Sequence, residues 1–379
     1  MKLQVHETLK DIPADDWNRL NETNNPFLCY QFLKALEESS CIGRHSGWLP
    51  QYLTLESENT LTGIAPLFLK SHSYGEYIFD WAWANAYEQA GLQYYPKLIA
   101  AVPFTPVTGP RLLVKNDKNA YLARQALIQG ALQHAQTLKV SSLHWLFIPE
   151  PQLAELIQQQ HMRRIGYQFH WHNQNYRDFD EFLAGFSAHK RKKVKRERRY
   201  VKEAGIHMQV VEGKDITAGM WNQFYAFHHA TIRYRGATPY LNAEFFRALG
   251  QTMPESVVLI VAKQGGETVA TALNLRNEHT LFGRYWGCRD NFHSLHFETC
   301  YYRAIDYCIE QGLQTFEAGA QGEHKLSRGF LPTPTYSAHW LSHVTFSSAV
   351  ADFLKRERNG IEFYMDELNE HSPFKQTGD

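Results

Sequence analysis

The sequence offers few of the features that disulfide-rich, secreted or membrane proteins need. Its five cysteines are odd in number, and no two are spaced as Cys-x-x-Cys, so reduced thiols are expected rather than a disulfide framework. No window approaches the roughly 18 to 20 apolar residues of a membrane span, and the N-terminus does not build the apolar stretch of a signal peptide. These absences predict a cytoplasmic protein without a transmembrane segment.

Several common catalytic motifs are also missing. The chain has no Gly-x-Gly-x-x-Gly after a strand, no phosphate-binding loop ending in Gly-Lys-Ser/Thr, no Gly-x-Ser-x-Gly and no His-Glu-x-x-His, which argues against the enzymes that carry those motifs. His296-Phe297-Glu298 matches half of a nucleobase deaminase motif, but no Pro-Cys-x-x-Cys follows it. The neighbouring His228 and His229 would point about 100° apart on a helix, so the 19 histidines do not predict a metal site.

Charge is balanced over the whole chain and concentrated in one segment. The 39 basic and 39 acidic residues cancel, so no overall field draws the protein to nucleic acid or membrane. Residues 190–199 hold eight basic residues and one acidic residue, and they fall in a helix predicted over 179–204. This segment would form a local cationic face on a mildly acidic body. Two interpretations stay open: the face contacts phosphates, or it is an ordinary solvated charge run.

Length and the pattern of elements predict two mixed α/β domains. The 379 residues, 44% of them apolar, suffice for two cores, and we place the domains at residues 1–172 and 173–379. For the first domain we expect strands at 3–5, 48–55, 61–70, 76–83, 142–148 and 167–171, and helices near 17 and over 27–36, 119–139 and 151–160. The polar Glu58-Asn59 turn makes a hairpin of 48–55 and 61–70.

The second domain has the more informative layout. After helix 179–204 we expect a strand at 206–211, helices at 220–234 and 243–249, a three-stranded meander at 257–263, 268–276 and 280–287, a helix over 294–311 and a strand at 315–318. GNAT-superfamily acyltransferases use this layout to hold a phosphate-bearing donor, since N–H groups and the dipole at a helix N-terminus favour phosphate. The turn 289–294 therefore predicts a donor contact through Arg289, Asn291 and Ser294, although it lacks the superfamily's closely spaced glycines.

Longer strings point to one family. The second half contains YWGC at 285–288, LHFETCYY at 295–302, GAQGEHK at 319–325, RGF at 328–330 and SAHW at 337–340, and the first contains NPF at 25–27, HSYGEY at 72–77, YYPK at 94–97 and VPFTPVTGPR at 102–111. These strings resemble the FemAB-like predicted N-acyltransferases, a bacterial group of peptidoglycan biosynthesis or recognition proteins in the GNAT superfamily. The resemblance spans nearly the whole chain and implies tandem GNAT-like domains.

The resemblance also implies catalytic residues. Fem-type enzymes place a lysine after the strand that follows this helix, and Lys325 looks like that lysine. Its ammonium would neutralise the oxyanion formed when an amine attacks an ester or thioester carbonyl. Glu323 or His324 would take the proton from the amine, histidine having the better-matched pKa, and Tyr285 is a candidate to protonate the leaving group. The alternatives are a solvated loop lysine, capping or orienting roles for Glu323 and His324, and core packing for Tyr285.

Further candidates would hold the two substrates. Donor phosphate would contact Lys190, Arg191, Lys195 and Arg328 in addition to the turn at 289–294. The acceptor would contact an aromatic, mixed-charge set from the first domain, namely Asp80, Tyr87, Tyr94, Lys97 and Arg111. Such a set also makes a good core, so both interpretations stay open.

The sequence thus predicts an N-acyltransferase that transfers an acyl or aminoacyl group to an amine. Acyl-CoA or aminoacyl-tRNA would be the donor substrate, no cofactor would be tightly bound, and a cell-wall precursor and tRNA are candidate partners. No cysteine or serine stands in a nucleophile motif, which favours direct attack by the amine. Two alternatives remain open: an acetyl-CoA-dependent acetyltransferase acting on a small amine, and a non-catalytic module that binds RNA or a cell-wall precursor.

Overall fold

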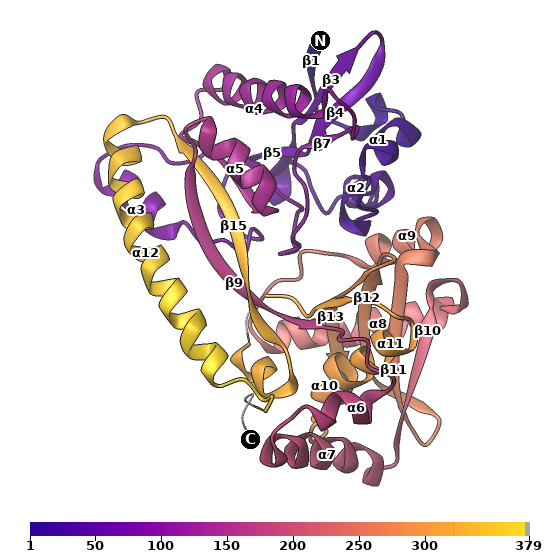
Figure 1. The fold of residues 1–379 in the computed structure, drawn as a ribbon. Coiled ribbons are helices and arrows are strands. Elements are labelled where there is room, and N and C mark those ends of the chain that lie inside the picture. Colours follow the sequence, from indigo (N-terminus) through magenta and orange to yellow (C-terminus); the bar gives the residue numbers. More distant parts are fainter. Residues whose placement is uncertain (321, 376–379) are drawn as a thin grey trace. The chain divides into compact units, whose positions relative to one another are not determined.

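The computed structural model describes residues 1–320 and 322–375 of the chain and divides them into two compact units (Figure 1). Unit 1 comprises Met1–Tyr167 and Pro334–Tyr364, and unit 2 comprises Gln168–Thr333 and the residues from Met365 onward. The domain boundary that the sequence places between residues 172 and 173 stays a prediction. The chain passes between the units within strands β9 (Met162–His172) and β15 (Leu331–Leu341) and within helix α12 (Val344–Glu370).

Unit 1 contains two sets of paired strands. Strands β1 (Lys2–His6), β3 (Tyr52–Ser57), β4 (Thr60–Ala65) and β7 (Leu113–Val114) pair antiparallel in that order. The second set contains strands β2 (Trp48–Pro50), β5 (Leu67–Lys70), β6 (Lys97–Ala100), β8 (Ser142–Ile148) and β15. In it β6 pairs parallel to β8, while β2 with β5, β5 with β6, and β8 with β15 pair antiparallel. Its helices are α1 (Ala14–Leu20), α2 (Tyr30–Glu38), α3 (Trp81–Gln89), α4 (Ala120–Thr137) and α5 (Glu150–Gln158).

Unit 2 contains the predicted meander. Strands β10 (Ile206–Glu212), β11 (Val257–Gln264), β12 (Glu267–Arg276) and β13 (Thr280–Cys288) are antiparallel neighbours, β14 (Thr315–Glu317) pairs parallel to β13, and β9 pairs antiparallel to β14. The helices are α6 (Phe179–Ala184), α7 (Ala188–Glu203), α8 (Ala218–Tyr234), α9 (Ala243–Thr252), α10 (Leu295–Phe297) and α11 (Arg303–Glu310). A π-helical turn, Glu298–Tyr302, joins α10 to α11.

The mixed α/β class predicted from the sequence is confirmed, while several elements differ from the prediction. Residues 76–83, expected to be a strand, instead form a loop and the start of α3. The hairpin strands are each divided, and Pro66, which has no N–H to pair, separates β4 from β5. Strands β6 and β15 and helix α12 were not expected.

The predicted helix over 179–204 is broken between α6 and α7. At the break, the backbone N–H of Ser187 donates to the carbonyl of Pro373, and the N–H of Lys375 donates to the carbonyl of Gly185. Phe186 is fully buried and packs against Phe374. Contacts with a segment nearly 190 residues away therefore override a helical pattern that local propensity favours.

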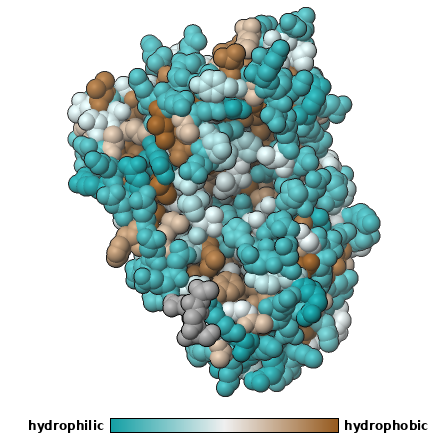
Figure 2. Space-filling model, viewed as in Figure 1, coloured by the Kyte–Doolittle hydropathy of each residue, from teal (hydrophilic) through white to brown (hydrophobic). Residues whose placement is uncertain are grey.

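Apolar side chains fill a separate core in each unit. In unit 1, residues of β3, β5, β6 and β8 pack against the apolar side of α4, including Leu127, Ile128 and Ala131. In unit 2, Val201 of α7 packs with Ile206, Val269 and Leu295. The face drawn in Figure 2 is largely hydrophilic, with apolar residues in small groups. None of the helices in the described part of the chain has the length and apolar content that crossing a membrane requires.

Gly287 of β13 lies directly against the backbone of α8. A Cβ atom at this position would lie 2.2 Å from the carbonyl carbon of Phe227 and 2.3 Å from the backbone nitrogen of His228. Because both obstructing atoms belong to the backbone of α8, a rotamer change cannot relieve the clash. The glycine in the YWGC string is thus needed for packing.

We expect Gly287→Ala to lower the free energy of unfolding by about 1–3 kcal/mol or more, since α8 must move away from β13. Gly360→Ala is the matched control, because Gly360 lies on α12 with no atom within 4 Å of the added methyl group. There the same change should stabilise by about 0.5–1 kcal/mol through helix propensity. Chemical denaturation of both variants measures the difference, and equal stabilities would contradict the assigned packing.

Candidate functional site

The strongest candidate site in unit 2 is the glycine-bounded loop that carries Lys325. A short 3-10 helix, Glu323–Arg328, lies between Gly322 with φ +114° and Gly329 with φ +90°, conformations that L side chains rarely adopt. The Lys325 side chain is buried, the residue being 2% exposed, and its Nζ donates to the carbonyl oxygens of Gly319 at 3.0 Å and Ala320 at 3.3 Å. The backbone therefore turns the ammonium inward, which excludes the solvated-loop alternative.

Lys325 has an unusual proton affinity. Burial, followed by the nearby Arg284 guanidinium, lowers its pKa to about 7. Within the described residues it forms no ion pair with a carboxylate. The guanidinium of Arg284 is paired with Glu317 at 3.1 Å. An ammonium held by carbonyl dipoles alone is strongly attracted to new negative charge. That property suits the stabilisation of an oxyanion.

His324 stands beside Lys325 and contacts the π-helical turn. Its Nε2 lies 2.9 Å from the hydroxyl oxygen of Tyr301. Burial, then the charges of Arg328 and Lys325, lower the pKa of His324, so its imidazole is neutral at pH 7 and able to accept a proton. Glu323 is exposed on the same loop.

Tyr285 packs among aromatic side chains. It projects from β13, and its ring centroid lies 5.4 Å from that of His228 and 5.1 Å from that of Phe246. These contacts favour the packing interpretation of Tyr285. Its role in protonating the leaving group stays a prediction.

Helix α7 displays the basic segment with two different sides. Lys195 is exposed and lies 3.0 Å from Asp180, while Lys190 and Arg191 are half-buried. Arg328, another predicted donor contact, is buried and donates to both carboxylate oxygens of Glu197 at 2.9 Å. The exposed cations of α7 can meet a phosphate directly, whereas Arg328 already has a partner.

The turn predicted to hold donor phosphate is exposed. Arg289 donates to Asp290 at 2.9 Å and to Glu267 at 2.7 Å, so two carboxylates already compensate its charge. Asn291 is exposed, and Ser294 adopts φ +63° with its hydroxyl 2.9 Å from Nδ1 of His293. The helical run that follows begins with the three residues of α10. Donor binding at this turn stays a prediction.

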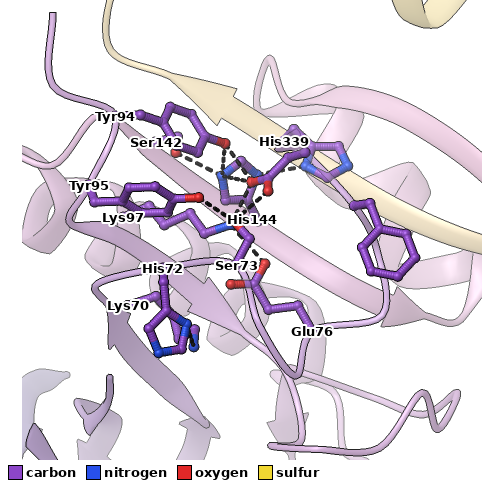
Figure 3. A network of polar contacts seen from close by, with 12 residues as sticks. Lys70, His72, Ser73, Glu76, Tyr94, Tyr95, Lys97, Ser142, His144 and His339 are labelled. Atoms are coloured by element: carbon purple, nitrogen blue, oxygen red, sulfur yellow. Dashed lines mark hydrogen bonds and ion pairs between the residues drawn. The ribbon is translucent and has the colours of Figure 1, made fainter. Parts of the chain in front are cut away.

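In unit 1 the structure brings three of the predicted acceptor residues into one buried polar network (Figure 3). The ammonium of Lys97 donates to Glu76 Oε2 at 2.7 Å, to Ser73 Oγ at 2.8 Å and to Asp80. The hydroxyl of Tyr94 donates to Asp80 at 2.6 Å. Lys97 is fully buried with two carboxylates, and their charges raise its pKa despite the burial. It is a structural cation in this state.

The network extends to a pair of histidines. Nδ1 of His144 lies 2.7 Å from Nδ1 of His339, so one of the two nitrogens donates to the other. Nε2 of His144 lies 2.7 Å from the Ser142 hydroxyl, and Nε2 of His339 lies 2.8 Å from the Ser337 hydroxyl. Burial lowers the pKa of both histidines, that of His144 to about 3. Both rings are therefore neutral at pH 7.

The other two predicted acceptor residues lie outside the ion-pair cluster. Tyr87 is buried on α3, packs on the ring of Tyr94 at 5.2 Å, and has no hydrogen-bond partner for its hydroxyl among the described residues. Arg111 is fully buried, and its guanidinium donates to the carbonyl oxygens of Val107 at 2.7 Å and Gly109 at 2.9 Å. Arg111 thus holds the backbone of its own segment, VPFTPVTGPR, in a folded conformation.

Three of the five thiols are poorly suited to act as nucleophiles. Burial raises the pKa of Cys288 and of Cys300, and it raises that of Cys308 as well. A nucleophilic cysteine needs a lowered pKa to form thiolate near neutral pH. Among the described residues, no three histidine, cysteine or acidic side chains are grouped so that they could hold a metal ion.

Comparison with known proteins identifies the family of this chain. A family model described as peptidoglycan biosynthesis/recognition, FemAB-like, matches residues 8–376. The chain belongs to the FemAB-like family. The predicted acyltransferase class is thereby confirmed, whereas the match identifies neither donor nor acceptor. No curated protein sequence matches the chain.

Solved structures agree with the FemAB-like assignment at the level of the fold. The crystal structure of FemX is similar at a TM-score of 0.54 and 11% identity, over 93% of this chain and 100% of that one. The C-terminal domain of a putative lysylphosphatidylglycerol synthetase from Agrobacterium fabrum gives the same TM-score and identity over 89% and 96%. L-PGS from Bacillus licheniformis gives 0.51 and 12% over 86% and 96%. The predicted mixed α/β fold is confirmed, and its arrangement is similar to that of FemX.

The sequence analysis did not single out several polar residues of the unit 1 network and of the Lys325 loop contacts. Glu76, His144 and His339 complete the network of unit 1, and Glu197 and Tyr301 contact the Lys325 loop. One signal was available. Glu197 is the single acid within the basic segment 190–199, and a lone acid among cations at a position in register with Val194 and Val201 indicates an inward-facing charge.

Buried histidines predict that the protein loses stability in acid. The folded-state pKa is lowered to about 3 for His144 and His170 and to about 4 for His161, His228 and His296, with burial as the largest cause in each. Because the unfolded chain binds these protons first, near pH 6.5, their contribution is present above that pH and is lost as the pH falls toward about 4.

We expect the free energy of unfolding to fall by about 1.4 kcal/mol per pH unit for each such histidine across this range. Denaturant titrations between pH 7.5 and pH 5 measure the slope. His161→Gln should reduce the slope by about 1.4 kcal/mol per pH unit, the contribution of one such histidine. A stability that stays flat down to pH 5 would contradict the neutral, buried state of these rings.

Proposed function

We propose that this FemAB-like protein is an N-acyltransferase that moves an acyl or aminoacyl group from a phosphate-bearing donor to the amine of an acceptor. Acyl-CoA and aminoacyl-tRNA are the two donor classes that fit, and a cell-wall precursor fits the family's description. The observation that carries the proposal is the buried Lys325 ammonium, which lies on a glycine-bounded loop and whose pKa is lowered to about 7.

In the proposed reaction the acceptor nitrogen attacks the donor carbonyl directly. The carbonyl carbon becomes tetrahedral, and Lys325 donates a hydrogen bond to the oxyanion. The neutral imidazole of His324 accepts the proton that the attacking nitrogen releases. Collapse of the intermediate breaks the bond to the ester oxygen or thioester sulfur, and that leaving group takes up a proton. The raised pKa values of the cysteine thiols support a route without a covalent acyl-enzyme.

The exposed cations of α7 support a donor that carries phosphate. Lys192, Lys195, Arg196 and Arg199 are exposed on this helix, and the burial of Arg328 against Glu197 leaves the outer side of α7 as the main cationic surface of the segment. Contacts between such side chains and phosphates release counterions and depend on salt. We assign the donor phosphates to this surface.

Lys325→Met tests the catalytic assignment. Methionine keeps the length and apolar stem of lysine but removes the ammonium, so turnover should fall by about 100-fold or more. Lys70→Met is the matched control, because Lys70 in unit 1 is also fully buried with a pKa lowered to about 7. Circular dichroism and thermal denaturation check that both variants fold. Near-normal turnover in folded Lys325→Met protein would refute the role.

Calorimetric titration distinguishes the donors. We expect either coenzyme A or charged tRNA to bind saturably, and Lys195→Ala with Arg196→Ala to weaken that binding and reduce its dependence on salt. Saturation by coenzyme A identifies an acyl-CoA enzyme, and saturation by charged tRNA identifies an aminoacyltransferase. Binding of neither ligand would sink the assignment of a phosphate-bearing donor, and RNA binding without turnover would indicate a non-catalytic module.

A further inference from the structure

Glu197 is a buried acid in the most basic segment of the chain. It lies on α7 three residues after Val194 and four before Val201, and all three face inward. The residue is 7% exposed. A carboxylate in an apolar stripe is costly unless it is paired and hydrogen-bonded, so its partners account for its position.

Two partners hold the Glu197 carboxylate, and both come from the neighbourhood of Lys325. A terminal nitrogen of Arg328 donates to both carboxylate oxygens at 2.9 Å, and the hydroxyl of Tyr302 donates to Oε2. Arg328 belongs to the 3-10 helix that carries Lys325, and Tyr302 ends the π-helical turn. Glu197 therefore joins α7 to two other segments of unit 2.

Arg328 links Glu197 to the catalytic loop, the segment 322–329 that carries His324 and Lys325. Its other terminal nitrogen donates to the backbone carbonyl of His324 at 2.6 Å, and its guanidinium carbon lies 3.4 Å from the ring centroid of Phe297. The His324 carbonyl belongs to the peptide group that leads into Lys325. Moving the guanidinium would move that peptide and redirect both neighbouring side chains.

We propose that Glu197 is a positioning residue for acyl transfer, which acts through Arg328 to fix the peptide between His324 and Lys325. This inference rests on the proposed function, since it assigns Glu197 a part in the same reaction. The pairing also compensates the Arg328 charge, so this guanidinium does not compete with Lys325 for the oxyanion. The single acid of the basic segment thus organises the catalytic loop, while the cations on the other side of α7 remain available to phosphate.

A purely structural ion pair would have different consequences. Removing it would lower stability without a specific effect on the chemical step. A positioning pair predicts that kcat falls while the donor KM stays nearly constant, because the exposed cations of α7 are unaffected. Displacement of reacting groups by about 1 Å costs on the order of 100-fold in rate. We therefore expect kcat for Glu197→Gln to fall by about 10- to 100-fold.

Glu203→Gln provides the matched control. It makes the same chemical change on the same helix, at an exposed residue paired with Arg199 at 3.4 Å, and it should leave kcat unchanged. Glu197→Asp keeps the charge but shortens the side chain, so kcat should also fall in that variant. It serves as the second test if Glu197→Gln does not fold. Equal loss of kcat in Glu203→Gln, or normal kcat in both folded Glu197 variants, would overturn the inference.

A second measurement does not depend on turnover. The imidazole of His324 faces the charges of Arg328 and Lys325 and the rings of His296 and Tyr301. Loss of the Glu197 charge leaves Arg328 uncompensated, so NMR titration should show a lower pKa for His324 in Glu197→Gln. Adding Arg328→Met should raise that pKa again but leave kcat low, since the hydrogen bond to the His324 carbonyl is still missing.

The two measurements separate the two hypotheses. If the wild-type protein transfers no acyl group but Glu197→Gln still shifts the His324 titration, the proposed function fails and the connection through Arg328 remains. If the protein is active and a folded Glu197→Gln variant leaves both kcat and the His324 pKa unchanged, the positioning role is wrong. Recovery of kcat in the double variant would show that charge, and not position, was the cause.

Discussion

A lysine buried away from water needs a compensating partner, and the kind of partner distinguishes the two polar clusters of this protein. Lys97 and Lys325 are both nearly inaccessible to water. Lys97 contacts two carboxylates and keeps its charge, while Lys325 contacts two backbone carbonyls and has a pKa of about 7. A shift of this size corresponds to about 5 kcal/mol between the protonation states. The first lysine holds a loop in place, and the second is poised to respond to charge that appears beside it.

The irregular helix beside the Lys325 loop is connected to that loop through two consecutive residues. In a regular α-helix adjacent side chains point about 100° apart. Tyr301 contacts His324 of the Lys325 loop. Its neighbour Tyr302 contacts Glu197, which is itself paired with Arg328 of the same loop. Both tyrosines lie in the π-helical turn, which inserts an extra residue into the helix and changes the directions of its side chains. Such turns are frequently found at functional sites, and here two consecutive residues of the turn contact the Lys325 loop, Tyr301 directly and Tyr302 through Glu197.

The sequence predicted the parts of the fold that depend on local pattern and missed those that depend on distant partners. The meander β11–β13 was predicted because its turns contain Gly265-Gly266 and Asn277-Glu278 between alternating strands. Helix α12 was missed although its buried Val350 and Leu354 have helical spacing. Strand β15 was missed because it contains Pro332 and Pro334, and proline is uncommon inside strands. The break at Phe186 depends on Phe374, and no local pattern reveals it.

The candidate site divides in the same way between local and distant signals. The glycines around Lys325 are visible in the sequence, and Gly322 and Gly329 have positive φ values in the structure. The burial of Lys97 was not visible, because its compensating acids, Glu76 and Asp80, precede it by 21 and 17 residues. Tyr94 and Lys97 were expected to contact the acceptor, as residues near loops often contact ligands. Whether a loop lysine faces a ligand or the protein's own carboxylates depends on tertiary contacts.

The buried network of unit 1 specifies one conformation for the segment that follows β5. Ser73, Glu76 and Asp80 face inward and meet the Lys97 ammonium, while Tyr74, Phe79 and Trp81 between and beyond them are exposed. If the segment shifted by one residue, it would bring an aromatic ring to the ammonium and a carboxylate to the surface, leaving a buried cation without compensation. The cost of an unpaired buried charge is several kcal/mol, which is larger than the gain from covering one exposed ring. The charges beneath the loop therefore determine which aromatic side chains the protein presents to its surroundings.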